Sequence, residues 1–127
     1  MLDHIGFAVS DFGRSLGFYK TVLEPLGYGV MMEVPAEVSG GESFAGFGRD
    51  GRAQFWIGTG TSLAGGLHVA FTASSRAAVD AFHTIALGTG AADNGKPGLR
   101  PHYHPNYYGA FVLDPDGHNI EAVCHLP

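Results

Sequence analysis

The first stretch with a regular pattern of apolar and polar positions is residues 2–9, near the start of the chain. Bulky apolar residues there alternate with a histidine and two small residues. A period of two predicts a strand, here with one bulky face and one open face. Ile5, Phe7 and Val9 form the bulky face, and His4, Gly6 and Ala8 form the open face.

Apolar residues then recur every three or four positions, which predicts a helix over residues 12–24. Ser10 or Asp11 can cap its first turn, because a side-chain oxygen can accept from free backbone N–H groups there. Pro25 and Gly27 end it. The predicted apolar stripe consists of Phe12, Leu16, Tyr19 and Leu23.

Three strands are predicted after this helix, over residues 28–34, 43–48 and 53–58. The last two are joined through Asp50-Gly51, a pair typical of hairpin turns. Residues 35–42 contain a proline and two glycines and therefore predict a loop.

The same order of elements returns after a linker over residues 58–66. A strand is predicted over residues 67–72, and a helix over 76–87 is capped by Ser74 or Ser75. Residues 88–106 are rich in glycine and proline and predict at most one short strand, near 100–104. The last strands, 108–113 and 118–124, flank the turn-forming Asp114-Pro115-Asp116-Gly117.

The two halves also match each other in sequence. His4-Ile5-Gly6-Phe7 and His68-Val69-Ala70-Phe71 agree position by position, 64 positions apart. Asp50-Gly51 corresponds to Asp116-Gly117, 66 positions later. Each half therefore predicts a strand, a helix and three strands (βαβββ). One helix covers one sheet face only, so two such units are expected to share a domain.

Composition narrows the class of protein. A chain of 127 residues with 45% hydrophobic and 15% charged residues fits one globular domain. The net charge is −5 and no basic run occurs, so neither nucleic acid nor a membrane is an expected partner. A single cysteine, Cys124, cannot form an internal disulfide. With no apolar span or leader-like start, a cytoplasmic protein that acts on a small molecule is expected.

Three side chains are candidate metal ligands: His4, His68 and Glu121. The two histidines occupy equivalent open-face positions in the repeat. Strand alternation turns Glu121 away from its apolar neighbours, and a carboxylate in such company is costly unless it is paired or metal-bound. Two imidazoles and a carboxylate suit Zn, Ni, Fe(II) or Mn. The alternative is that each histidine is an ordinary exposed strand residue.

A second group of candidates lies in the irregular segment before the last two strands, where loops commonly carry binding groups. Arg100 can hold a carboxylate or phosphate through its planar fork. Trp56, on a strand of the first half, is a candidate wall of the pocket. The alternative is a surface loop folded on its own aromatic rings. The loop candidates for substrate binding or proton transfer are Arg100, His102, Tyr103, His104, Tyr107 and Tyr108.

The chain resembles the vicinal-oxygen-chelate superfamily, which includes glyoxalase I, bleomycin-resistance proteins and extradiol dioxygenases. The resemblance implies an α+β fold of two βαβββ modules, at about residues 1–62 and 67–127, that form a partly open, glyoxalase-like barrel of mixed sheet with helices outside. The motifs that carry it are Asp3-His4-Ile5-Gly6-Phe7, His68 and Asp114-Pro115-Asp116-Gly117-His118-Asn119-Ile120-Glu121.

The resemblance also implies a function. It indicates a metal-dependent enzyme that acts on a small oxygen-bearing molecule, with the lyase or isomerase chemistry of glyoxalase I as the nearest match. Glu121 is then both ligand and base, and His104 or His102 assists proton transfer. The resemblance further implies a homodimer, in which His4 of one protomer faces the partner subunit's His68 and Glu121.

One departure from glyoxalase I leaves alternatives open. Glyoxalase I takes a fourth ligand from the strand equivalent to residues 53–58. Counting from the two Asp-Gly turns places Phe55 at the position equivalent to Glu121, and a slip of one residue gives Trp56 or Gln54. Only Gln54 could bind a metal. The alternatives are a metal-free binding or sequestration protein of the bleomycin-resistance kind, and an Fe(II) dioxygenase.

Overall fold

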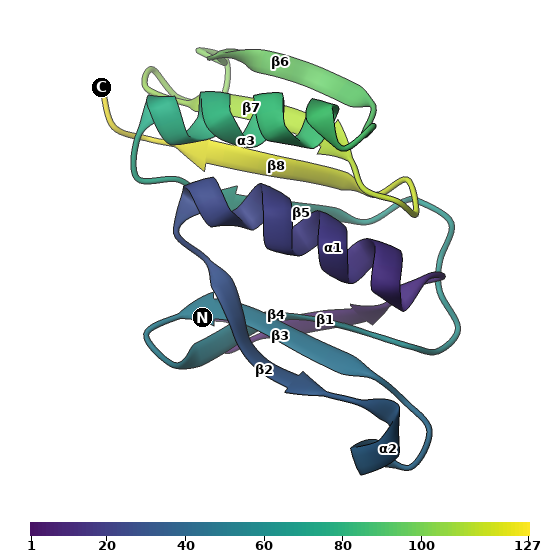
Figure 1. The fold of residues 1–127 in the computed structure, drawn as a ribbon. Coiled ribbons are helices and arrows are strands. Elements are labelled where there is room, and N and C mark those ends of the chain that lie inside the picture. The colour runs from purple at the N-terminus through teal and green to yellow at the C-terminus, as the bar shows by residue number, and fades with distance from the viewer.

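The chain folds into two four-stranded sheets, one from each half, with the two long helices side by side (Figure 1). The computed structural model describes all 127 residues. The first half contains β1 (Ile5–Ala8), α1 (Phe12–Leu23), the 3-10 turn η1 (Glu24–Leu26), β2 (Gly29–Val34), α2 (Ala36–Ser39), β3 (Phe44–Arg49) and β4 (Arg52–Gly58). The second contains β5 (His68–Thr72), α3 (Arg76–Gly88), β6 (Asp93–Leu99), β7 (Tyr108–Leu113) and β8 (Asn119–Cys124).

The two sheets repeat one topology. Their strand orders are β1-β4-β3-β2 and β5-β8-β7-β6, and in each the first strand pairs in parallel with the last. The remaining pairs are antiparallel. The predicted α+β fold of two βαβββ modules is confirmed. Within one chain the two sheets do not close into a barrel.

Each helix starts as its sequence predicts. The Asp11 carboxylate accepts from the Arg14 N–H at 3.1 Å, and the Ser75 hydroxyl accepts from the Ala78 N–H at 3.1 Å. After η1, Gly27 adopts φ +86°, a left-handed conformation that glycine tolerates without strain.

The core lies between the helices and the bulky faces of the sheets. Burying these apolar side chains is the main favourable term for the fold. The helices bury Phe18, Tyr19, Val22, Leu23, Val79, Phe82 and Ala86, and the strands bury Ala45, Phe47, Phe55, Ile57, Ala110, Val112, Ile120, Ala122 and Cys124.

Polar side chains join the two modules at the turn between β7 and β8. The hydroxyl of Tyr19 on α1 donates to Asp114 Oδ2 at 2.6 Å, and both residues are buried. Asp114 Oδ1 accepts from the backbone N–H groups of Asp116 and His118, each at 2.9 Å. Ser10, just before α1, donates its N–H and hydroxyl to Asp116. We call Ser10, Tyr19, Asp114 and Asp116 the turn clamp.

Three details differ from the sequence predictions. The strand predicted near 100–104 is absent, and β6 lies earlier, at Asp93–Leu99. Its glycines and Pro97 disfavour a strand, but an edge position tolerates proline, and β7 supplies a long partner. The loop predicted over 35–42 contains the short α2. Ile5 is 42% exposed, because it lines a small cavity between the modules.

Candidate active site

The open face of the second sheet holds a paired histidine and glutamate. Glu121 on β8 lies opposite Ala70 on β5, and His68 begins β5. The Glu121 side chain is only 2% exposed, and its Oε1 lies 3.2 Å from His68 Nε2. Its other oxygen accepts a hydrogen bond from the hydroxyl of Tyr107. A carboxylate this buried therefore has partners at both oxygens.

The second ring nitrogen of His68 determines what can lie between the pair. His68 Nδ1 is 3.0 Å from the backbone oxygen of Asn119, which can only accept, so Nδ1 carries a proton. In the neutral imidazole Nε2 then has a lone pair, directed at a carboxylate oxygen. Two acceptors at this distance repel unless a proton or a cation joins them. Metal-binding histidines commonly tie the distal N–H to a carbonyl or carboxylate in this way.

His4 has the same arrangement at the edge of the first sheet. Its Nδ1 donates to Asp3 Oδ1 at 2.7 Å, which leaves Nε2 free, and its side chain is 59% exposed. The hydrogen bond from His4, then the charge of His4, lowers the pKa of Asp3, with Arg52 contributing further. Each candidate histidine therefore offers Nε2 while its Nδ1 is held by a neighbouring oxygen.

The two halves of the predicted ligand set do not meet within one chain. No three His, Cys, Asp or Glu side chains gather closely enough to hold a metal ion. His4 belongs to the first sheet, whereas His68 and Glu121 belong to the second. A site that combines all three requires the open face of a second protomer.

Register identifies the residue of the first module that corresponds to Glu121. Gly6 is opposite Trp56 in the pair β1–β4, as Ala70 is opposite Glu121 in the pair β5–β8. Counting from the turns, which placed Phe55 there, was wrong by one residue. A register shift follows Phe47, where Gly48 pairs with Ala53 while Phe47 pairs with Phe55, so one additional residue enters β4. Phe55 instead points into the core and is buried.

A layer of rings surrounds the paired His68 and Glu121. Phe111 on β7 stacks on the His68 ring at 6.3 Å, and the Arg100 guanidinium lies 5.5 Å from the Phe111 centroid. Arg100 also donates to the backbone oxygens of Gly98 and Lys96, which fixes its orientation. Burial, then the hydrogen bond to Glu121, raises the pKa of Tyr107 above that of an ordinary phenol.

The remaining loop candidates contact Tyr107, either directly or through another ring. Tyr103 packs edge-on against Tyr107 at 5.1 Å, and His102 packs on Tyr103 at 4.1 Å. His104 accepts from the Asn106 N–H, and its ring meets His125, which in turn meets Tyr107. Among these rings only Tyr107 hydrogen-bonds to Glu121.

Tyr108 is on the other side of the sheet from this group. Its hydroxyl donates to Asp80 Oδ1 on α3 at 2.6 Å, and the Arg76 guanidinium lies 5.3 Å from its ring. The hydrogen bond to Asp80 is the main cause that raises the pKa of Tyr108. Tyr108 is the first residue of β7 and turns toward α3, whereas Tyr107 lies in the loop just before the strand, so Tyr108 has no access to the His68–Glu121 face.

Comparison with known proteins places this arrangement in a family. A model of the Glyoxalase/Bleomycin resistance protein/Dioxygenase superfamily matches residues 1–122. The chain belongs to this superfamily. The resemblance found in the sequence motifs is therefore confirmed. No curated protein matches the chain.

Solved structures from the superfamily have the same fold. A glyoxalase/bleomycin resistance protein from Albidiferax ferrireducens T118 is 28% identical, with a TM-score of 0.76 over 98% of this chain and 97% of that one. A family enzyme from Burkholderia phytofirmans PsJN is 19% identical, with a TM-score of 0.70 over 98% of both chains. Glyoxalase I from Zea mays is 18% identical, with a TM-score of 0.70 over 96% of this chain and 45% of that one.

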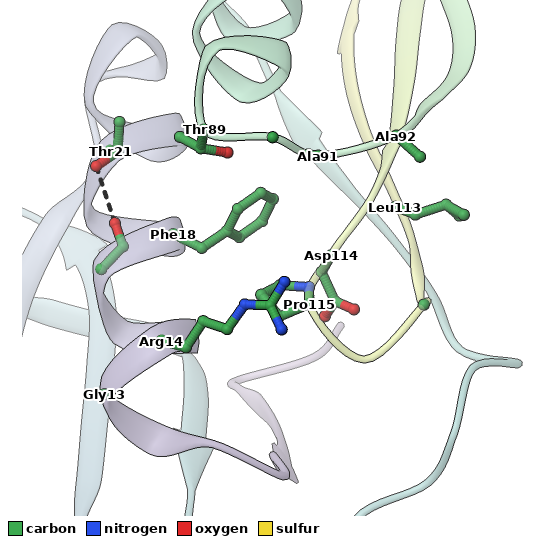
Figure 2. Close-up of a pocket in the computed structure, with 13 residues that line it drawn as sticks. Gly13, Arg14, Phe18, Thr21, Thr89, Ala91, Ala92, Leu113, Asp114 and Pro115 are labelled. Carbon is green, nitrogen blue, oxygen red and sulfur yellow. Dashed lines mark hydrogen bonds between the residues drawn. The ribbon is translucent and has the colours of Figure 1, made fainter.

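A further cleft of this superfamily member is on the helix side, away from the histidines. It measures about 560 Å³ and lies between α1, the end of α3 and the β7–β8 turn (Figure 2). Thr21 and Thr89 on its wall donate to backbone oxygens of their own helices, and Asp114 is held within the turn clamp. Arg14 reaches toward the turn. Because Thr21, Thr89 and Asp114 already have hydrogen-bond partners, Arg14 is the one side chain of this group that is free to bind a ligand. We therefore interpret the cleft as a gap between the modules.

Sequence reasoning missed three contacts of the site. The contact of Asp3 with His4 was not predicted, although an acidic residue next to a candidate ligand is a signal for a histidine partner. The Asn119 carbonyl and the ring of Phe111 gave no signal, because their contacts depend on strand pairing.

None of the helices is long and apolar enough to cross a membrane.

Proposed function

We propose that this protein is a homodimeric, metal-dependent enzyme of the vicinal-oxygen-chelate type that acts on a small molecule with two neighbouring oxygens. His4 of one protomer and the partner subunit's His68 and Glu121 hold one divalent cation: Zn, Ni, Fe(II) or Mn. The observation that carries this proposal is the facing pair of His68 Nε2 and Glu121 Oε1 at 3.2 Å.

The donor set fits a cation on chemical grounds. Two imidazoles and one carboxylate match the preferences of these metals and leave positions for water or substrate. Asp3 and the Asn119 carbonyl already orient Nε2 of the two histidines. A cation at such a site polarises a carbonyl or hydroxyl oxygen and stabilises the negative charge that develops on it.

The chain's own residues supply the remaining chemistry. Glu121 accepts a proton from the substrate, and the Tyr107 hydroxyl holds its second oxygen in place during that transfer. His104, whose ring contacts Tyr107 through the ring of His125, assists proton exchange with solvent. Arg100, His102 and Tyr103 contact the substrate at the mouth of the pocket, and Trp56 forms its wall. Glyoxalase-I-like lyase or isomerase chemistry is the nearest match.

Metal binding provides the direct test. Purified chain is stripped with a chelator, reconstituted with Zn, Ni, Mn or anaerobic Fe(II), dialysed and analysed for metal. About one cation per wild-type chain is expected, and His68→Ala and Glu121→Gln are expected to retain little. His83→Gln is the matched control, because His83 pairs with Asp93 on the helix side at 2.9 Å. Trace metal in the wild type, or equal metal in all variants, contradicts the proposal.

One observation favours a metal-free binding protein of the bleomycin-resistance kind as a second candidate. Trp56 holds the position at which the first module could have supplied a further ligand. His68 and Glu121 then form an imidazolium–carboxylate pair. In that case ligand-dependent thermal shifts are expected to persist in the presence of chelator. An Fe(II) dioxygenase, the third candidate, is distinguished by oxygen uptake with iron.

A further inference from the structure

The open face of the first sheet carries aromatic rings where the second sheet carries its acid. Trp56 corresponds in register to Glu121, and Phe44 follows two positions away on the neighbouring strand β3. Both side chains are half-buried. The two modules therefore differ at equivalent positions: the second carries a carboxylate and the first an indole ring.

Glycines allow these two rings to lie against the sheet. Gly46 is directly opposite Trp56, and a Cβ atom built on it would lie 2.8 Å from indole Cε2. Gly58 is directly opposite Phe44, and its Cβ would lie 2.6 Å from the ring. Real Cβ atoms do not approach other atoms so closely, so each ring occupies space that only glycine leaves free. Each ring therefore lies close against a glycine of the neighbouring strand.

These rings border an open hollow of about 440 Å³ with a single titratable group. That group is His4, whose Nε2 is free for the proposed cation. Flat aromatic surface beside one ligand suits a molecule that is planar and apolar at one end and polar at the other. The residues around the hollow are His4, Gly6, Phe7, Ala8, Phe44, Trp56, Ile57, Gly58 and Thr59.

We infer that this hollow binds a planar, unsaturated ring of the substrate, which stacks on Trp56 while two neighbouring oxygens next to the ring reach the cation. Trp56 is the specificity-determining residue for that ring. The contact between the oxygens and the cation rests on the proposed function. The contact between the ring and Trp56 rests on the first sheet alone. An acyclic substrate would leave the aromatic side of the hollow without a matching partner.

Three related acids distinguish the contribution of the ring to binding from the contribution of the oxygens. Mandelate, hexahydromandelate and lactate share the same α-hydroxy-carboxylate group. They carry a planar ring, a saturated ring and a methyl group. The chain has one tryptophan, so its indole emission reports on Trp56 alone. Mandelate is expected to quench this emission with saturation in the metal-loaded dimer, and to bind roughly tenfold more tightly than lactate. Hexahydromandelate is expected to bind more weakly than mandelate.

Variants test whether Trp56 is responsible. Trp56→Leu is expected to reduce mandelate affinity about tenfold, measured by calorimetry, and to leave lactate affinity and metal content unchanged. Trp56→Phe keeps a flat ring and is expected to retain most of the mandelate preference. Leu126→Ala, an exposed apolar change outside the hollow, is the control. Equal affinities for the three acids in the wild type overturn the inference without any variant, as does equal loss of all three in Trp56→Leu.

Failure of this inference and failure of the proposed function give different results. If the wild type binds metal but shows no preference for mandelate, the ring-binding role is wrong and the metal site stands. If the wild type binds no metal, the proposed function is wrong. Saturable quenching by mandelate in the metal-free chain then still supports the ring-binding hollow, and absence of quenching overturns it.

Discussion

At the scale of single residues, each candidate histidine ligand is oriented by an oxygen of a neighbouring residue. Asp3 holds the Nδ1 of His4, and the Asn119 carbonyl holds the Nδ1 of His68. A backbone carbonyl cannot be removed by substitution, whereas a carboxylate can. The two histidines therefore differ in how far a mutation can disturb their orientation.

Asp3→Asn is expected to weaken metal binding by about tenfold, because a neutral amide makes the imidazole of His4 a poorer ligand than a carboxylate does. Competition with a chromophoric chelator measures the change in Kd. Asp50→Asn, in the exposed hairpin turn of the same module, removes the same charge away from the histidine and is the control. If both variants bind metal like the wild type, Asp3 has no role in holding His4.

At this scale, alternation along the strands predicted the directions of the candidate side chains. It placed His4 and His68 on open faces and turned Glu121 away from Ile120 and Ala122, which the structure buries in the core. It could not predict the bond from Tyr107 to Glu121, because a loop conformation brings that hydroxyl to β8. Nor could it predict Trp56 at the position equivalent to Glu121, which depends on an added residue in β4.

At the scale of elements, the turn clamp gives the first part of the most specific motif, Asp114-Pro115-Asp116-Gly117, a structural role. Asp114 and Asp116 hold the β7–β8 turn against α1 and the residue before it. They therefore fix how the second module sits on the first. The motif ends at Glu121, so it joins a structural turn to a site residue.

Tyr19→Phe is expected to lower the free energy of unfolding by about 1–3 kcal/mol, because it leaves one oxygen of a buried carboxylate without a donor. Urea denaturation measures the change. Tyr28→Phe is the matched control. It removes the hydrogen bond from the Tyr28 hydroxyl, just before β2, to the Thr72 carbonyl. That carbonyl can bind water instead, so the free energy of unfolding is expected to fall by about 1 kcal/mol or less. An equal loss in the two variants would show that the clamp is no stronger than an ordinary contact.

Alkaline pH is expected to weaken the fold through the same tyrosine. Burial, then the charge of Asp114, raises the pKa of Tyr19 far above its ordinary value. The unfolded chain ionises Tyr19 near pH 10 while the folded chain keeps it protonated, so the unfolded state binds fewer protons and stability falls as pH rises. The contribution is fully present below about pH 10. Wild-type stability should fall more steeply than that of Tyr19→Phe above this pH; parallel curves would contradict it.

The elements themselves were predicted to different degrees. Both long helices and the strands that carry regular alternation lie close to their predicted positions, because capping residues and periodicity act locally. β6 could not be predicted, since a run with Asn94, Gly95, Pro97 and Gly98 has little intrinsic preference for a strand. Pairing with β7 stabilises it, and Phe111 fills the space over Gly95.

At the scale of the whole molecule, the two open faces are incomplete separately. The first offers His4 and aromatic rings, and the second offers His68, Glu121 and the Tyr107 loop. Both face away from the helices that hold the modules together. A dimer that brings unlike faces together gives two equivalent sites by its twofold symmetry.

Complementation between subunits tests this arrangement. Two differently tagged chains, His4→Ala and His68→Ala, are co-expressed and the mixed dimer is purified through both tags. One of its shared sites then lacks both histidines and the other is intact, so about one cation per mixed dimer is expected, against almost none in either pure variant. An absence of metal from the mixed dimer would mean that the sites are not shared between chains. A monomer in light scattering would exclude the dimer directly.

The outer strand β6 has a consequence for the behaviour of the protein at high concentration. Pro97 carries no N–H, and pairing with β7 shifts register at Gly95 and again before Gly98. An exposed strand edge can be a template for fibrils because it offers a row of unpaired donors and acceptors, and proline and bulges weaken such a template. The missing N–H and the register shifts interrupt this row, so stacking of chains on this edge is expected to be less favourable than on a regular strand. The glycines and the proline that prevented prediction of this strand from the sequence therefore also disfavour amyloid formation at its edge.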